Sequence, residues 1–171
     1  MAAAAAAGPA GGRSPDDQVQ SDLGLIRAKV AGVQGSLVAT SDGFLVAHDV
    51  PGLEPTAIAA LAAATRSLAG RTTASTGRGQ FREAIARGSD GYIAVYAAGE
   101  SALVAVVGTA DLNIGMLRYQ TREIVERIAA YAVRLGAWPA PSGPAPARPD
   151  RPAPLPQRRR PAGPGRGPRI S

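Results

Sequence analysis

The sequence predicts an α+β domain in the order α-β-β-α-β-β-β-α, built on a five-stranded antiparallel sheet. One long helix is expected on one face of the sheet and the two terminal helices on the other. Three observations predict this fold: three short β-rich stretches in succession over residues 80–108, a hairpin pattern over residues 36–47, and three stretches with apolar residues at helical spacing.

The first of these, residues 80–108, contains three strands joined by turns. Its links, residues 88–91 and 99–100, contain glycine beside aspartate or glutamate. Parallel neighbours would need a crossover of about a dozen residues or more, so these strands are expected to pair antiparallel.

The polarity of these strands predicts their places in the sheet. The side chains of residues 80–87 alternate between the two faces of the strand, and this strand is the most polar of the three, which is typical of an edge. Residues 102–107 are apolar on both faces, as in a central strand. An edge that carries Phe81 and Ile85 needs a partner. Either a helix covers it, or the same strand of a second subunit extends the sheet across a two-fold axis.

The hairpin and the terminal helices follow from local signals. Residues 36–40 and 44–47 are predicted strands around the turn at residues 41–43, and they must join the other three strands because an isolated hairpin is marginal in water. The first helix is expected from Ser14–Pro15, as cap and first residue, and the last is expected to be capped by residues 109–111. Their apolar stripes are Val19, Leu23, Ile26 and Val30, and Leu117, Ile124, Ile128, Tyr131 and Leu135.

The middle helix, residues 54–74, carries two apolar faces. One stripe comprises Ile58, Leu61, Ala62, Thr65, Leu68 and Ala69, and a second, thin face comprises Ala57, Ala60 and Ala64. Small side chains allow a second helix to approach closely, so one side is expected on the sheet and the other on a twin helix. The alternative is that the alanines only raise helix propensity.

Composition divides the chain into three parts. Residues 1–14 are Ala/Gly-rich and are predicted to be a disordered leader, residues 15–137 form the domain, and residues 138–171 are predicted to be a disordered Pro/Arg-rich tail. Residues 1–138 contain 12 basic and 12 acidic residues, so the whole net charge of +6 belongs to the tail.

The residue types present exclude several kinds of site. The chain has no cysteine and one histidine, which removes disulfides, thiolate chemistry and histidine metal clusters. His48 and Asp49 are the only candidate acid–base pair, and an exposed loop histidine is the expected reading. No apolar run approaches the roughly 20 residues that span a bilayer, so a cytoplasmic protein is expected.

No nucleotide site of Walker type is present. Such a loop needs G-x-x-x-x-G-K-[ST], and the only lysine, Lys29, lies inside the first predicted helix. Residues 70–79 are interpreted as a flexible link, the alternative being an anion site formed with Arg71 and Arg78. We assign no catalytic, cofactor-binding or metal-binding residue, and we expect the chain not to be an enzyme.

Several motifs resemble the roadblock, or dynein light chain, family. Residues 30–47 resemble its helix-to-hairpin signature, residues 81–85 and 91–92 resemble its third and fourth strands, and residues 103–118 resemble its fifth strand and last helix. The Asn113-x-Gly115-x-x-Arg118 run is the most distinctive of them. The resemblance covers residues 17–135, with one departure at Ala31, where the family often has proline.

The resemblance implies a homodimer in which the middle helix and the third strand each meet their counterpart. It also implies a non-enzymatic adaptor that binds and regulates a Ras-like small GTPase, within a bacterial multi-protein set that includes a sensor histidine kinase. Candidate GTPase contacts are Arg66, Arg71 and Arg78, whose alternative role is solvated surface charge. The candidate dimer residues are Ile58, Leu61, Ala62, Thr65, Leu68, Phe81, Glu83 and Ile85.

Two other functions stay open. The domain could sense a small molecule, although few bulky aromatics are available to shape a pocket. The tail, with Arg158–Arg160, Arg166 and Arg169, could bind nucleic acid or an anionic surface such as the inner face of the membrane.

Overall fold

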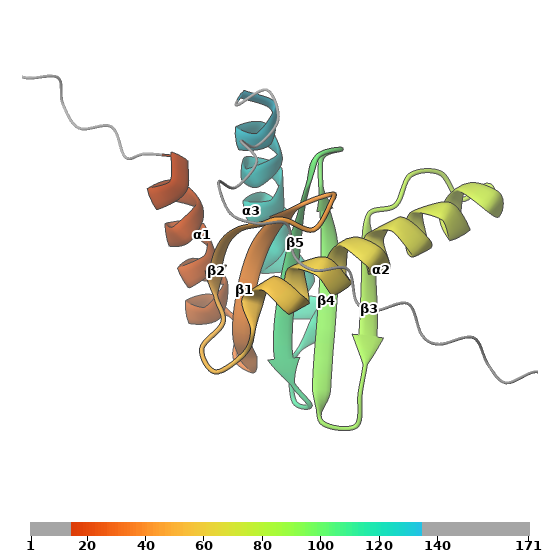
Figure 1. The fold of residues 1–171 in the computed structure, drawn as a ribbon. Coiled ribbons are helices and arrows are strands. Elements are labelled where there is room, and N and C mark those ends of the chain that lie inside the picture. Colours follow the sequence, from red (N-terminus) through yellow and green to blue (C-terminus); the bar gives the residue numbers. More distant parts are fainter. Residues whose placement is uncertain (1–14, 135–171) are drawn as a thin grey trace, which may run out of the picture.

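The computed structural model describes residues 15–134 and confirms the predicted order of elements (Figure 1). The helices are α1 (Pro15–Lys29), α2 (Pro55–Ser75) and α3 (Ile114–Arg134). The strands are β1 (Val33–Thr40), β2 (Leu45–Asp49), β3 (Glu83–Arg87), β4 (Gly91–Ala98) and β5 (Ala102–Thr109).

The five strands form one antiparallel sheet in the order β2-β1-β5-β4-β3. Both positional predictions are confirmed, since β5 is central and β3 is an edge strand. The hairpin of β1 and β2 joins the other three strands through β1, where Leu37 pairs with Ala105 of β5. The two edges of the sheet are therefore β2 and β3.

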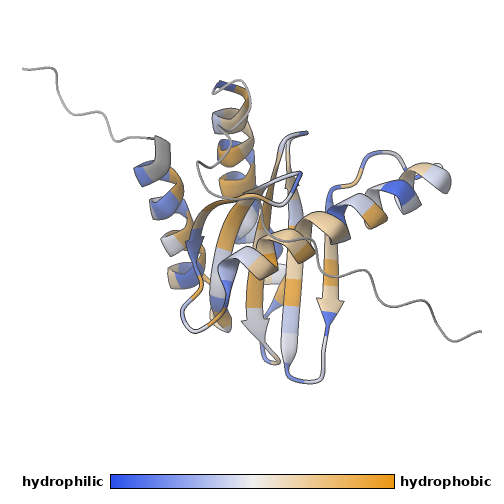
Figure 2. Ribbon diagram, viewed as in Figure 1, coloured by the Kyte–Doolittle hydropathy of each residue, from blue (hydrophilic) through white to orange (hydrophobic). Residues whose placement is uncertain are grey.

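The helices cover the two faces as predicted. In Figure 1, α2 crosses one face, and α1 and α3 lie on the other. Figure 2 shows that the central strands are mainly apolar, whereas polar segments alternate along α1. The larger core cluster contains Val19, Leu23 and Ile26 of α1, Val30 just after it, and Leu117, Ile124 and Ile128 of α3. A smaller cluster lies under α2 and contains Leu37, Ala39, Ala59, Ala62, Ala63, Val95, Leu103 and Ala105.

Two element boundaries differ from the prediction. Strand β3 begins at Glu83, because the chain before it, from residue 76 to residue 82, is the return loop from α2. Helix α3 begins at Ile114, and its cap is Asn113, whose side-chain oxygen accepts from the backbone N–H of Met116 at 2.9 Å. Residues 109–111 instead form a turn in which the Thr109 hydroxyl bonds to the Asp111 carboxylate.

Some predictions concern residues outside the described range. These are the leader at residues 1–14, the tail at residues 138–171, and Leu135 at the end of the last apolar stripe. The cap predicted at Ser14 also lies outside the described residues.

A buried ion pair joins α1 to α3. Asp22 is 7% exposed, and its two carboxylate oxygens accept from Arg127 at 2.7 and 3.2 Å. These hydrogen bonds raise the pKa of Arg127 because they stabilise the charged guanidinium. Arg127 also bonds to Glu123 at 2.6 Å, an i,i+4 pair along α3.

Replacing Asp22 by asparagine is expected to lower the free energy of unfolding by about 1–3 kcal/mol, because the arginine then loses its charged partner. Urea unfolding followed by circular dichroism measures the loss. The matched control is Glu123→Gln, which removes the exposed partner of the same arginine and should cost less than about 0.5 kcal/mol. Equal losses in the two variants would contradict the importance of the buried pair.

Candidate functional site

The outward face of α2 is unusually apolar for an exposed surface. Leu61 and Leu68 are 66% and 68% exposed, and Ala57, Ala64 and Thr65 on the same side are exposed as well. Large apolar side chains grouped on a surface often mark an interaction site. Ala59, Ala62 and Ala63 face the sheet instead, so α2 packs on the strands through small side chains and presents Leu61 and Leu68 to solvent.

The structure divides the predicted dimer residues of α2 into two groups. Leu61, Thr65 and Leu68 lie on the outward face. The prediction for Ala62 is wrong, because Ala62 is 1% exposed and packs against the sheet. Ile58 is partly buried against the same cluster, so it is mainly a contact within one subunit. The face that meets the sheet recurs at 59, 62 and 63, one position away from the predicted stripe.

The predicted residues near β3 lie on the free edge of the sheet. Ile85 is half-buried against the larger core cluster, and Phe81 lies in the return loop near Gly70 of α2. Glu83 forms an ion pair of 2.5 Å with Arg118 of α3. Figure 1 shows the last turns of α2 projecting beyond this edge, so the outward face of α2 and the β3 edge adjoin.

An arginine-lined groove opens at the same end of the sheet. Its volume is about 1790 Å³, and it lies between the C-terminal half of α2, the start of β3 and the exposed side of α3. It brings together the three predicted partner contacts and three arginines that sequence analysis missed. These six are Arg66, Arg71, Arg78, Arg82, Arg118 and Arg122.

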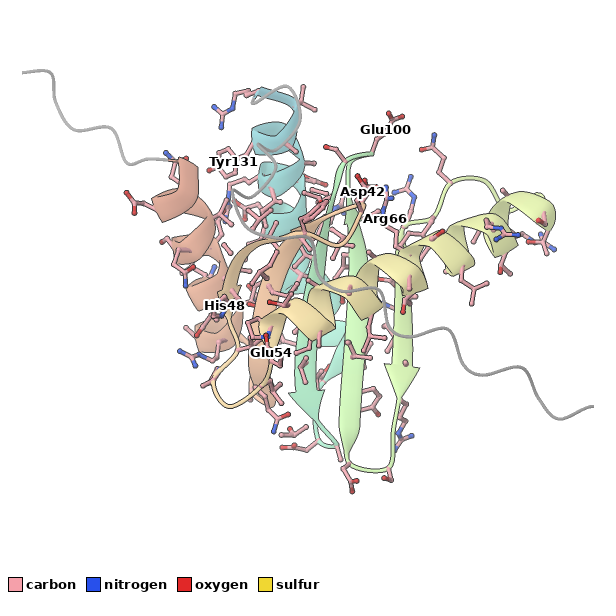
Figure 3. The ribbon with its side chains drawn as sticks, in the orientation of Figure 1. Asp42, His48, Glu54, Arg66, Glu100 and Tyr131 are labelled. Carbon is pink, nitrogen blue, oxygen red and sulfur yellow. The ribbon has the colours of Figure 1, made fainter. Side chains whose placement is uncertain are left out.

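The arginines of the groove differ in how they are held. Arg66 donates to the backbone oxygens of Gly99 and Glu100 at 3.2 and 2.8 Å, which ties α2 to the β4–β5 turn (Figure 3). Its Nε atom is buried and has no hydrogen-bond partner among the described residues. Arg71, Arg78 and Arg82 form no ion pair within residues 15–134 and are exposed. They are therefore the arginines best placed to meet an incoming group.

Three glutamates and a buried tyrosine complete the groove. Glu83 and Glu126 are paired with Arg118 and Arg122, the latter pair at 3.4 Å, so Glu100 is the remaining acid in the lining. Tyr96 is 6% exposed, and burial raises the pKa of its hydroxyl while the neighbouring Thr121 hydroxyl opposes the shift. The groove thus carries a net excess of positive charge.

The remaining sequence candidates do not assemble into a site. His48 is exposed on β2, and Figure 3 shows it apart from Arg66. Its neighbour Asp49 is bound to Arg27 at 3.1 Å and is not available as its acid–base partner. Residues 70–75 continue α2, so the link to β3 comprises residues 76–82 and not residues 70–79.

Within residues 15–134, no group of three or more His, Asp or Glu side chains is arranged to hold a metal ion. In the same range, no helix is long and apolar enough to cross a membrane.

Comparison with known proteins assigns this chain to a protein family. Residues 22–108 match the Roadblock/LC7 domain family. The chain belongs to the Roadblock/LC7 family. This roadblock domain is 33% identical over 103 residues to the uncharacterized protein MJ1340 of Methanocaldococcus jannaschii, an alignment that covers 60% of this chain and 90% of that protein.

Solved structures show the same roadblock fold. The Roadblock/LC7 domain from Streptomyces avermitilis is 20% identical with a TM-score of 0.62, and the alignment covers 67% of this chain and 97% of that one. The gliding protein MglB from Thermus thermophilus is 21% identical with a TM-score of 0.65, covering 71% of this chain and 93% of that one. At these identities the likeness concerns the fold.

Proposed function

We propose that this roadblock protein is a non-enzymatic homodimeric adaptor that binds and regulates a Ras-like small GTPase. The main support for the proposed dimer is the pair of exposed leucines, Leu61 and Leu68, beside the open edge of β3. A two-fold axis at that edge would pair β3 with its copy and bring the two α2 helices together on the same face of the extended sheet.

The arginine-lined groove is the candidate surface for the GTPase. Its open volume of about 1790 Å³ exceeds the roughly 300–1,000 Å³ of typical small-ligand sites, which favours a polypeptide over a metabolite. Arg71 and Arg78 are exposed and lack ion-pair partners in the described residues, so an acidic surface would meet them without first breaking a contact. Complementary charge of this kind mainly sets specificity and the association rate.

Family membership supports the choice of a GTPase as partner. The motif resemblance implied a GTPase regulator, and the match over residues 22–108 places the chain in that family. The same proposal puts the protein in the cytoplasm, in a complex that includes a sensor histidine kinase, with the Arg-rich residues 138–171 as a further contact for an anionic surface.

The test is a pull-down from the native cell with the full chain, followed by GTP turnover of the captured GTPase with and without this protein. The expected result is capture of a small GTPase whose turnover changes when the protein is added. Capture of kinase subunits in the same experiment would support the larger complex. Failure to capture any small GTPase under conditions in which the protein is folded would contradict the proposal.

Replacing both Arg71 and Arg78 by alanine is expected to weaken GTPase binding about tenfold, because two unpaired cations leave the contact. Titration calorimetry measures the affinity, and its salt dependence should fall in the variant. The matched control is Arg134→Ala, which removes an exposed arginine at the far end of α3 and should bind as the parent does. Unchanged affinity in the double variant would remove the groove as the contact surface. Arg66 is tested separately, because its loss also frees the β4–β5 turn.

A further inference from the structure

We propose that Glu83 and Arg87 of β3 pair reciprocally with Arg87 and Glu83 of a second copy, and that these two ion pairs determine the register of the dimer. The inference rests on the proposed dimer and adds the alignment of its strands, centred on Ile85. It makes Glu83 and Arg87 specificity-determining residues for the choice of partner subunit.

The hydrogen bonds of the β3–β4 hairpin show which backbone groups are free. The N–H of Ala97 donates to the carbonyl of Arg82 at 2.9 Å, and the N–H of Gly88 donates to the carbonyl of Gly91 at 2.8 Å. Residues 82 and 88 both belong to bonded pairs in this register, and bonded pairs alternate along an antiparallel ladder. The backbone groups of Glu83, Ile85 and Arg87 therefore point away from β4, toward the open edge.

Only residues with outward backbone groups can bond to a second copy of β3. A two-fold axis at Ile85 pairs residue 83 with residue 87 and uses all three outward residues of the strand. An axis at Ala84 would pair residue 83 with residue 85 and leave Arg87 opposite Phe81, which lies before the strand begins. The alignment centred on Ile85 thus makes the most backbone hydrogen bonds.

The side chains favour the same alignment. Glu83 contacts Arg118 of α3, and the Arg87 guanidinium lies 5.4 Å from the ring centre of Tyr92, which packs on the cluster covered by α1 and α3. Both side chains therefore lie on that face of the sheet. Directly opposite residues in such a pair have Cβ atoms about 4.5–5.5 Å apart, so each glutamate would face an arginine.

The existing contact of Glu83 is compatible with this pairing. Arg118 binds the Oε1 atom, and a carboxylate has enough lone pairs to accept from two arginines. Arg87 is exposed and forms no ion pair within residues 15–134. Other two-fold alignments would place these charges opposite Ile85, opposite their own copies or outside the strand, so the charges penalise a slipped register.

The test uses charge reversal in the full chain, with association measured by sedimentation velocity. Glu83→Arg and Arg87→Glu each place like charges opposite one another twice, and each is expected to weaken self-association about tenfold or more. The double variant, which exchanges the two charges, should regain the parent's association. A mixture of the two single variants, one of them tagged, should form a heterodimer, because both cross-strand pairs are then complementary.

The matched control is Arg82→Glu, which changes the charge by the same amount at a neighbouring position outside the proposed pairs and should leave association unchanged. If Glu83→Arg does not fold beside Arg118, Glu83→Gln replaces it, and its mixture with Arg87→Glu should associate more tightly than Arg87→Glu alone. If the parent chain dimerises but the double variant is not rescued and the mixed variants form no heterodimer, the proposed register is wrong and the proposed dimer still stands. A monomeric parent would instead overturn the proposed dimer.

Discussion

If the proposed dimer forms through the outward face of α2, replacing both Leu61 and Leu68 by glutamate is expected to convert it into folded monomers, with association weakened about 100-fold or more. The two side chains are 66% and 68% exposed in the single chain, so the change removes no contact from the core. In the dimer, four leucines would lose their apolar environment, and each burial contributes about 1.5–3 kcal/mol when complete. Light scattering after size exclusion measures the mass across a range of concentrations.

The matched control for this variant is Val133→Glu. Val133 is 78% exposed on α3, so it tests whether any charged substitution at an exposed apolar position dissociates the protein. The control should keep the mass of the parent. A double leucine variant that stays dimeric but loses the GTPase would show that the outward face of α2 binds the partner and not the second copy.

Replacing Gly91 by alanine is expected to destabilise the domain by about 1–3 kcal/mol, toward the upper end of that range. A Cβ atom at this position would lie 2.2 Å from the backbone oxygen of Gly108 on β5, so the two strands would have to separate. Because β4 and β5 form the middle of the sheet, the strain cannot relax at an edge. The melting temperature should fall by about 5–10 °C.

Gly88→Ala, at the other end of the same turn, is the matched control. A Cβ there would meet its nearest neighbour at 3.7 Å, an ordinary contact distance, and the position does not require a left-handed backbone. Its stability should change by less than about 0.5 kcal/mol. Similar losses at both positions would show that loss of glycine flexibility, and not the contact with Gly108, governs the effect.

The return loop and the groove show where local signals stop being informative. Arg66 and Arg118 are 52 positions apart, and the fold brings them to one groove only because α2 and α3, on opposite faces of the sheet, both line its β3 end. No local pattern around Arg82, Arg118 or Arg122 distinguishes them from solvated charges. By contrast, Asn113 was available to sequence reasoning as a cap three residues before Met116, and the competing Thr109–Asp111 turn obscured it.

The sequence by itself determined the order of elements, the antiparallel sheet, and the places of β3 at an edge and β5 in the centre. These follow from periodicity and from links too short for crossovers, which are local properties. Only the tertiary structure decided which face of α2 meets the sheet. Alanines occur on every side of this helix, so its local pattern does not determine which side packs on the sheet. The packing determines it, because the small residues at 59, 62 and 63 let the helix backbone lie close to the strands, and Leu61 and Leu68 remain exposed.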